Sequence, residues 1–138
     1  MAAGFKGLLR QRQLGELILN LRRRLRSLRR AKTPEEHAAA ASAISALVTK
    51  STWYQEARHV AFYSAFDGEI DCSPILSAAR GDGKGCYLPV LKADSLEFRE
   101  VTPQTETNRF GIAQPAAGAP RIEVRHLDLI LVPLVGFD

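Results

Sequence analysis

The stretch from His59 to Leu91, HVAFYSAFDGEIDCSPILSAARGDGKGCYLPVL, determines the fold class of this 138-residue chain. Its first eight residues form a β-branched and aromatic run, which predicts a strand that ends at the turn signal Asp67-Gly68. A short helix is expected through residues 74–79, with Gly81 as its stop. Cys86–Leu91 predicts a second strand. A strand, a helix and a strand at this spacing indicate a βαβ unit and an α/β sheet.

Two helices are expected before this unit. The first carries an apolar stripe at three- and four-residue steps, which is typical of an amphipathic helix; its members are Leu14, Leu17, Ile18, Leu21, Leu25 and Leu28. Thr33 and Pro34 then provide an N-cap and a proline at the first helical position. The second helix follows to about Lys50. A tight turn joins the two.

After the βαβ unit, Ser95–Val101 alternates apolar and polar residues, which predicts a half-exposed strand. Residues 102–125 are polar and rich in proline, and we expect loops there. The apolar run within Leu127–Val135 predicts a last, fully buried strand.

The composition is that of a globular chain. Apolar residues make up 46% and charged residues 25%, which excludes a largely disordered protein. The longest apolar run is seven residues, far short of the roughly 18 of a membrane span, so we expect no membrane partner. Cys72 and Cys86 have no ligand spacing and are expected to be free, buried thiols of a cytoplasmic protein.

Positive charge is concentrated at the start of the chain. Residues 1–32 hold ten Lys or Arg and one acid, and six of the arginines fall within residues 22–30. Such a segment is also typical of a transit peptide, but it holds a single serine and continues into the fold. A basic helix that binds RNA is an alternative, although no aromatic residues interleave with the arginines to stack on bases.

No short motif identifies the chemistry. The glycines of Gly81–Gly85 match neither a Walker A loop nor a dinucleotide fingerprint, so we interpret them as a helix stop and a turn. The three histidines have no metal-ligand spacing, and we assign no metal-binding residue.

Two loops contain candidate binding residues. Glu69 follows the first strand just after the glycine turn, where a carboxylate can accept from N–H groups of a ligand; a solvated loop acid is the alternative, and Asp71 is assigned to helix capping. Phe110 lies beside Gly111 in the polar segment. The local pattern favours inward packing of Phe110 over an exposed ring that stacks on a ligand.

Taken together, these segments resemble the 5-formyltetrahydrofolate cyclo-ligase family (methenyltetrahydrofolate synthetases). The resemblance covers about residues 17–138 and leaves residues 1–16 as an extension. It rests on five stretches in the family's order: the Arg-rich helix with Arg30–Glu35, Phe66–Asp71, Gly83–Val90, Asn108–Pro115 and Leu127–Asp138.

The resemblance implies a Rossmann-like α/β/α sandwich of the sugar-phosphate isomerase and CoA-transferase type, opened by the helical pair. It implies ATP- and Mg-dependent cyclisation of 5-formyltetrahydrofolate to 5,10-methenyltetrahydrofolate. We expect the protein to be a monomer located in the cytoplasm. In that reaction the formyl oxygen attacks the γ-phosphate, the second folate nitrogen closes the ring, and phosphate leaves. A nucleic-acid partner is not expected; a folate-binding protein without catalysis is the second alternative.

By position, the resemblance implies nucleotide binding at Ile18 and Arg22 and substrate binding at Glu69 and Ser64, with Phe110 near the pterin. Two departures stand out. Ile18 occupies a position where the family usually has a lysine, so it brings no phosphate-binding charge. The family also continues past the equivalent of residue 138 with a segment of the type GxRLGxGxGYYD and metal-associated acids; we therefore expect a C-terminally incomplete domain with little or no cyclo-ligase activity.

Overall fold

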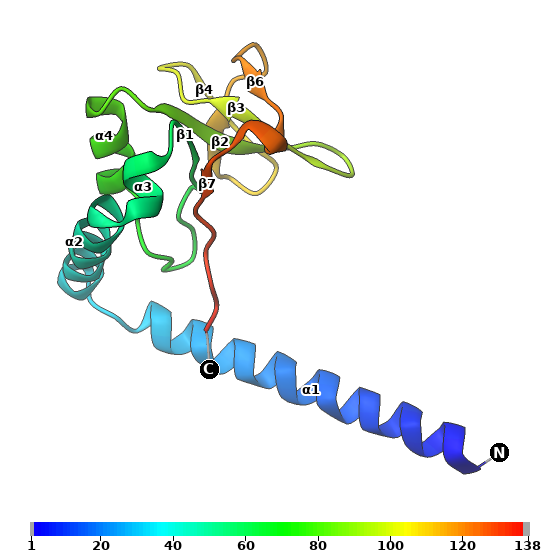
Figure 1. The fold of residues 1–138 in the computed structure, drawn as a ribbon. Coiled ribbons are helices and arrows are strands. Elements are labelled where there is room, and N and C mark those ends of the chain that lie inside the picture. The colour runs from blue at the N-terminus through cyan, green and yellow to red at the C-terminus, as the bar shows by residue number, and fades with distance from the viewer. Residues whose placement is uncertain (1, 137–138) are drawn as a thin grey trace.

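The computed structural model describes residues 2–136 as a mixed sheet with helices packed beside it and one long helix that extends from the rest (Figure 1). The helices are α1 (Ala2–Arg30), α2 (Pro34–Lys50), α3 (Thr52–Glu56) and α4 (Ser73–Gly81), with a 3-10 turn at Val124–His126. The strands are β1 (His59–Ala61), β2 (Gly85–Leu91), β3 (Leu96–Glu100), β4 (Thr105–Thr107), β5 (Ala113–Pro115), β6 (Arg121–Ile122) and β7 (Leu129–Ile130).

The central sheet has five strands in the order β6-β3-β2-β1-β7. β1 pairs in parallel with β2 on one side and with β7 on the other, whereas β3 is antiparallel to β2 and to β6. α4 connects the parallel pair β1 and β2, which confirms the predicted βαβ unit. β4 and β5 form a separate antiparallel hairpin.

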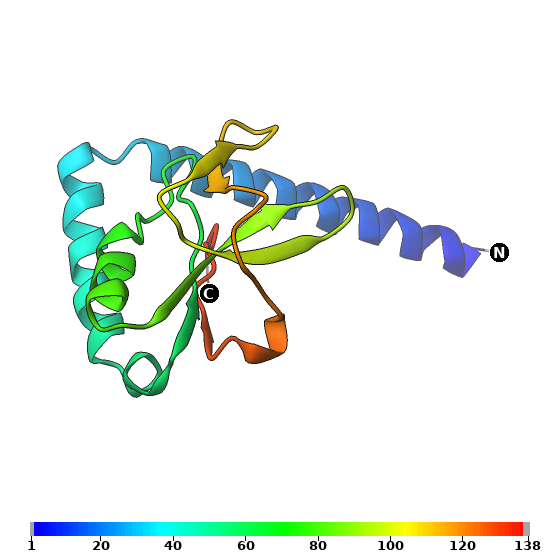
Figure 2. The ribbon, with the colours of Figure 1, turned by 90° about the horizontal axis from the view of Figure 1, so that it is seen from above.

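The helices α2, α3 and α4 gather on one side of the sheet in both views (Figures 1 and 2). The core that they form with it consists of Tyr54, Ala57, Val60, Phe62, Cys72, Ile75, Ala79 and Cys86. The α/β class and the opening pair of helices are therefore confirmed. None of the helices in the described part of the chain combines the length and apolarity needed to cross a membrane.

The start of α2 shows how the sequence sets a boundary. The Thr33 hydroxyl accepts from the Glu36 backbone N–H at 3.1 Å, and the Glu36 carboxylate accepts from the Thr33 N–H at 2.9 Å. This capping box satisfies two N–H groups that a bare helix terminus leaves unpaired. It begins α2 after a connection of three residues from the end of α1, in keeping with the predicted tight turn.

Two boundaries differ from the sequence expectations. α1 begins at Ala2 and passes through residues 16 and 17 without a break, so the proposed extension is helical. β1 ends at Ala61, and residues 62–66 continue without regular pairing, although the Phe62 N–H still donates to the Tyr87 carbonyl at 2.8 Å.

The expectation of a fully buried strand over Leu127–Val135 is wrong. β7 covers only Leu129–Ile130, and Ile130 is 40% exposed while Val132 is 64% exposed. In the described part of the chain β7 pairs with β1 alone and lies at the sheet edge. An apolar run has the same pattern in a central strand and in an edge strand, so the run by itself does not separate the two.

Candidate functional site

The turn Phe66–Glu69 places the first candidate carboxylate. The Phe66 carbonyl accepts from the Glu69 N–H at 3.1 Å, and the two central residues have positive φ, 56° at Asp67 and 75° at Gly68. These are the features of a type I′ turn, which Asp-Gly favours. The Glu69 carboxylate folds back and accepts from the Phe66 N–H at 3.1 Å. The turn therefore fixes both the backbone and the side chain of Glu69.

The end of α1 binds this turn through two arginines. Arg29 donates from Nε to the Asp67 carbonyl at 2.9 Å and from Nη2 to the Asp67 carboxylate at 3.4 Å. Arg29 Nη1 also lies 4.0 Å from the Glu69 carboxylate. Arg30 bonds to the other oxygen of Asp67, and this hydrogen bond holds the pKa of the Asp67 carboxyl below its usual range. Two positive groups thus face two carboxylates.

Arg22 and Ile18 lie on the same face of α1 as Arg29. A spacing of seven residues corresponds to about two helical turns and about 10.5 Å along the axis, and Ile18 lies one turn further from Arg29. Arg22 is exposed and Ile18 is 46% exposed. Both are therefore accessible, and among the described residues neither forms a hydrogen bond or ion pair with the turn.

The last described residues meet α1 beside this cluster (Figure 1). Arg29 Nη1 donates to the Leu134 carbonyl at 3.5 Å. Gly136 packs against Leu25, since a Cβ on Gly136 would come within 2.6 Å of Leu25 Cδ1. Leu25 lies between Arg22 and Arg29 on the helix, so three separate parts of the chain meet within two turns of α1.

Ser64 connects the segment after β1 to the β4–β5 hairpin. Its hydroxyl donates to the Ala113 carbonyl at 2.9 Å. At the tip of the hairpin, the Asn108 carboxamide accepts from the N–H groups of Phe110 and Ile112. Phe110 is 58% exposed, so inward packing, the interpretation favoured by the local pattern, is wrong. The Asn108 side chain thus binds the backbone of the hairpin tip, and the Phe110 ring points away from it into solvent.

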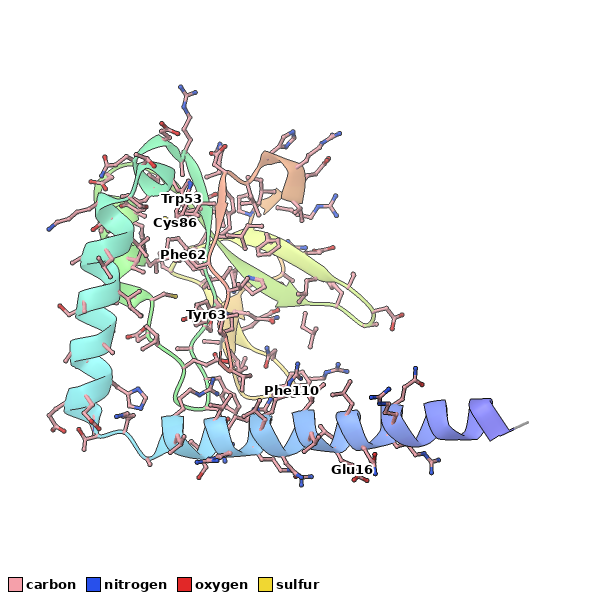
Figure 3. The ribbon with its side chains drawn as sticks, turned by 60° about the horizontal axis from the view of Figure 1, so that its bottom comes forward. Glu16, Trp53, Phe62, Tyr63, Cys86 and Phe110 are labelled. Carbon is pink, nitrogen blue, oxygen red and sulfur yellow. The ribbon has the colours of Figure 1, made fainter. Side chains whose placement is uncertain are left out.

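The ring of Phe110 has a cation beside it. The Arg109 guanidinium carbon lies 4.9 Å from the ring centroid, within the range of a cation–π contact. Figure 3 places Phe110 apart from Phe62, which is part of the core, and from Tyr63, which is partly buried against that core. The hairpin therefore presents an aromatic face and a positive group at one point on the surface.

The candidate residues Ser64 and Glu69 line two different, neighbouring cavities. One, of about 480 Å³, lies beyond the end of β1 and is lined by residues that include Ser64 and Asp71. The other, of about 750 Å³, lies between α2 and the loop before α4, and its lining includes His37, Glu69 and Asp71. Asp71 lines both. The expectation that Asp71 caps α4 is met only in part: its carboxylate accepts from the Ser73 N–H at 2.9 Å, but Cys72 occupies the N-cap position and makes no side-chain cap hydrogen bond. Arg22 lines neither cavity.

Buried hydroxyl and thiol groups near Ser64 are structural. Tyr63 donates to the Ile70 carbonyl at 2.7 Å, and burial raises the pKa of Tyr63 to about 12. The Cys72 thiol donates to the Tyr63 carbonyl, and burial raises its pKa as well. Both cysteines are free and buried, as predicted. A raised thiol pKa lowers the thiolate fraction, so Cys72 is not activated as a nucleophile.

Sequence reasoning missed Arg29. The available signal was its spacing of seven residues after Arg22, which puts both on one helix face. Nothing in the local sequence, however, separates Arg29 from its solvated neighbours, because its partners Asp67 and Glu69 lie about forty residues later in the chain.

Metal ligands do not converge in the described residues: they contain no group of three or more His, Cys, Asp or Glu side chains that could hold an ion.

Comparison with known proteins supplies the family. Residues 18–138 match the 5-formyltetrahydrofolate cyclo-ligase family. The 5-formyltetrahydrofolate cyclo-ligase of Escherichia coli K12 is 33% identical over 120 residues, covering 83% of this chain and 66% of its own length. That of Haemophilus influenzae is 33% identical over 90 residues, covering 61% of this chain and 48% of its own length. The chain therefore spans about two thirds or less of the curated relatives it matches.

Solved structures agree in fold. The NMR structure of Aquifex aeolicus 5,10-methenyltetrahydrofolate synthetase superimposes with a TM-score of 0.78 at 24% identity, covering 86% of this chain and 61% of that one. A 5,10-methenyltetrahydrofolate synthetase from Mycoplasma pneumoniae gives a TM-score of 0.65 at 19% identity, covering 86% and 64%. At these identities the likeness concerns the fold.

Proposed function

Because this chain belongs to the 5-formyltetrahydrofolate cyclo-ligase family, we propose that it binds 5-formyltetrahydrofolate beside the turn Phe66–Glu69, as the substrate of ATP-dependent cyclisation to 5,10-methenyltetrahydrofolate. The observation that carries the proposal is the contact of Arg29 with Asp67 and Glu69. It holds a candidate substrate-binding carboxylate beside the arginine face of α1.

The reaction requires a phosphate acceptor and a ring closure in the same site. The formyl oxygen attacks the terminal phosphate of ATP, the second folate nitrogen then attacks the activated carbon and loses its proton, and the oxygen leaves with the phosphate. The products are the methenyl folate, ADP and phosphate. Little of this chemistry needs a protein nucleophile; it needs both substrates held together and the phosphate charge neutralised.

The described residues fit these demands. Glu69 is an acceptor for the N–H groups of a pterin, and Ser64 lies where the segment after β1 meets the hairpin. The exposed ring of Phe110 offers a stacking surface for a flat heterocycle. Arg22 is an exposed guanidinium, suited to phosphate oxygens; Ile18 contributes only an apolar contact one turn earlier.

Magnesium belongs to the proposal through ATP alone. Mg²⁺ binds nucleotide phosphates while it keeps several waters and takes only one or two carboxylates from a protein. One or two carboxylates do not distinguish such a site from other surface acids, and the described residues contain no group of three or more ligands; we assign no residue to the ion and derive no step through it.

Equilibrium dialysis with 5-formyltetrahydrofolate tests the binding site. Glu69→Gln keeps the shape of the side chain and removes its charge, and we expect at least a tenfold rise in Kd, since a hydrogen bond to a charged group is worth about 1.5–3 kcal/mol. Glu16→Gln is the matched control, because Glu16 projects from the side of α1 away from the sheet (Figure 3); its Kd should equal that of the wild type. Absence of saturable binding by the wild-type chain would contradict the proposal.

Absorbance of the methenyl product separates catalysis from binding alone. The chain is mixed with 5-formyltetrahydrofolate, ATP and Mg²⁺, with omission of ATP as the control. A rise that requires ATP and is reduced in Glu69→Gln assigns the full reaction to this chain. If the chain binds 5-formyltetrahydrofolate but the absorbance does not rise, the chain binds folate without catalysing the cyclisation, which is the non-catalytic alternative.

The exposed arginines favour one further candidate, RNA binding by α1. Arg22, Arg23, Arg24 and Arg26 are exposed and form no ion pair within the described residues. Binding of this kind falls steeply with salt. A linear decrease of log K with log salt, lost when these four residues are changed to Gln, would support it; salt-independent or undetectable RNA binding would reject it.

A further inference from the structure

Arg29 differs from the arginines around it in its burial. Its side chain is 16% exposed, whereas that of Arg30 is 60% exposed. The neighbouring arginines Arg22, Arg23, Arg24 and Arg26 are exposed. An arginine is buried at this level only when its donors have partners, because the cost of removing the guanidinium from water is otherwise uncompensated.

The partners of Arg29 come from two distant parts of the chain. Nε donates to the Asp67 carbonyl and Nη2 to the Asp67 carboxylate, while Nη1 faces the Glu69 carboxylate and the Leu134 carbonyl. The planar fork of a guanidinium can meet all of these directions at once, which an ammonium cannot. One side chain therefore joins α1, the turn and the segment after β7.

The turn is shaped to receive this side chain. A Cβ on Gly68 would lie 3.4 Å from Arg29 Cγ and 3.5 Å from the Arg29 carbonyl oxygen, so the glycine backbone passes directly over Arg29. The positive φ of Asp67 and Gly68 turns the Asp67 carbonyl toward Nε. The fixed geometry of the turn then determines where the next residue, Glu69, begins.

We propose that Arg29 is the positioning residue that sets the direction of the Glu69 carboxylate and its place relative to the Arg22 face of α1. This inference rests on the proposed function, in which Glu69 binds the substrate. Arg29 acts through Glu69 and the turn and does not itself bind the folate. Arg30 has a different role, because it bonds to Oδ1 of Asp67 and forms no hydrogen bond or ion pair with Glu69 among the described residues.

The variants that test this role are Arg29→Gln, Arg29→Lys, Glu69→Gln and the double variant Arg29→Gln/Glu69→Gln. Arg26→Gln is the matched control: it removes the same charge on the same helix from a residue that forms no ion pair or side-chain hydrogen bond in the described structure. Circular dichroism and urea unfolding establish that each variant is folded before it is used.

The first readout requires no ligand. Hydrogen exchange of the Phe66 amide, which donates to the Glu69 carboxylate, reports whether that carboxylate stays in place. We expect Arg29→Gln to accelerate this exchange at least tenfold, Arg29→Lys to accelerate it less, and Arg26→Gln to leave it unchanged. Unchanged exchange in Arg29→Gln would overturn the inference whether or not the chain binds folate.

The second readout is the Kd for 5-formyltetrahydrofolate. We expect Arg29→Gln to raise it about tenfold, a typical coupling between residues in contact, and Arg29→Lys to restore part of the affinity. In the Glu69→Gln background Arg29→Gln should have no further effect, because its influence passes through Glu69. If Arg29→Gln raised the Kd by the same factor in the wild type and in Glu69→Gln, the positioning role would be overturned, because a general structural loss lowers the affinity whether or not the Glu69 carboxylate is present.

Failure of the proposed function gives a different pattern. If the chain does not bind 5-formyltetrahydrofolate, or Glu69→Gln binds as well as the wild type, the proposed role of Glu69 is wrong while the exchange of the Phe66 amide still reports on Arg29. Accelerated exchange would then support Arg29 as the residue that holds the turn. Unchanged exchange would reject the positioning role of Arg29 as well as the folate-binding role of Glu69.

Discussion

Replacing Gly68 by Ala should destabilise the chain through backbone strain, and the size of the effect follows from the structure. Gly68 has φ of 75°, in the left-handed region that L-residues enter at a cost of about 1–2 kcal/mol. The nearest atom to a new Cβ would be Arg29 Cγ at 3.4 Å, an ordinary contact that adds little. We therefore expect a loss of about 1–2 kcal/mol, equivalent to about 3–7 °C in Tm for a chain of this length.

Two other glycines provide matched controls. Gly83 has almost the same φ, 74°, but nothing lies within 4 Å of its Cβ position, so Gly83→Ala measures the backbone strain alone. Gly81 ends α4 without a positive φ and has the same open space, so Gly81→Ala should be neutral or slightly stabilising. Gly68→Ala and Gly83→Ala should agree within about 0.5 kcal/mol, the usual limit for surface effects.

Urea unfolding followed by circular dichroism measures the three variants, with equal m values as the check that the midpoints can be compared. Folate affinity then separates the two strained positions: only Gly68→Ala disturbs the turn that carries Glu69, so only it should raise the Kd. A Gly68→Ala variant as stable as Gly81→Ala would refute the left-handed turn on which the site is built.

Three further outcomes follow from individual side chains. Thr33→Ala removes the hydroxyl that caps α2 and should cost about 1 kcal/mol in urea unfolding; unchanged stability would argue against the cap. Arg30→Gln should raise the pKa of Asp67 toward its ordinary 3.8 in a carbon NMR titration. Because the pKa of Asp67 is lowered in the folded state, the ionised carboxylate stabilises the fold at any pH above its ordinary pKa, and this stabilisation is lost as the pH falls through the lowered pKa. The difference in unfolding free energy between the Arg30→Gln variant and the wild type should therefore disappear below about pH 4. Burial raises the pKa of Cys72 and Cys86, so iodoacetamide at pH 8 should modify them slowly in the folded chain and rapidly in urea; rapid modification without urea would contradict their burial.

The parts of the fold that could be predicted have strong local signals. The order of elements in the βαβ unit was predictable because apolar strand residues and turn signals alternate along this stretch. Its boundaries were predicted less well: β1 ends at Ala61, before the Asp67-Gly68 turn, and the glycine of positive φ after α4 is Gly83 instead of Gly81. The capping box at Thr33 likewise defines the start of α2 from residues three positions apart. In both cases the interactions that form the element lie within it.

Elements that depend on distant partners were not predictable. α3 has only five residues, too few for a helical period to be visible. β4 and β5 have three each, lie in a polar segment and are defined by their pairing with one another. The exposure of Phe110 depends on the bonds of Asn108, which the local aromatic pattern does not reveal.

The candidate site divides in the same way. Glu69 was a candidate from its local pattern, a carboxylate just after a glycine turn, but that pattern left a solvated loop acid as the alternative, and the assignment came from the family resemblance. Arg29 was not, because an arginine on a basic helix gains its role only when the turn packs against it. The family resemblance therefore pointed to the residue proposed to contact the ligand, and neither it nor the local pattern pointed to the residue proposed to position it.

An NMR titration of the ¹⁵N-labelled chain with 5-formyltetrahydrofolate tests the central claim most directly. The amide signals of Ser64, Glu69 and Phe110 should shift together along one saturable curve, and Glu69→Gln should move that curve to higher ligand concentration. Saturable shifts confined to other parts of the chain, or none at all, would contradict a folate site beside the turn Phe66–Glu69.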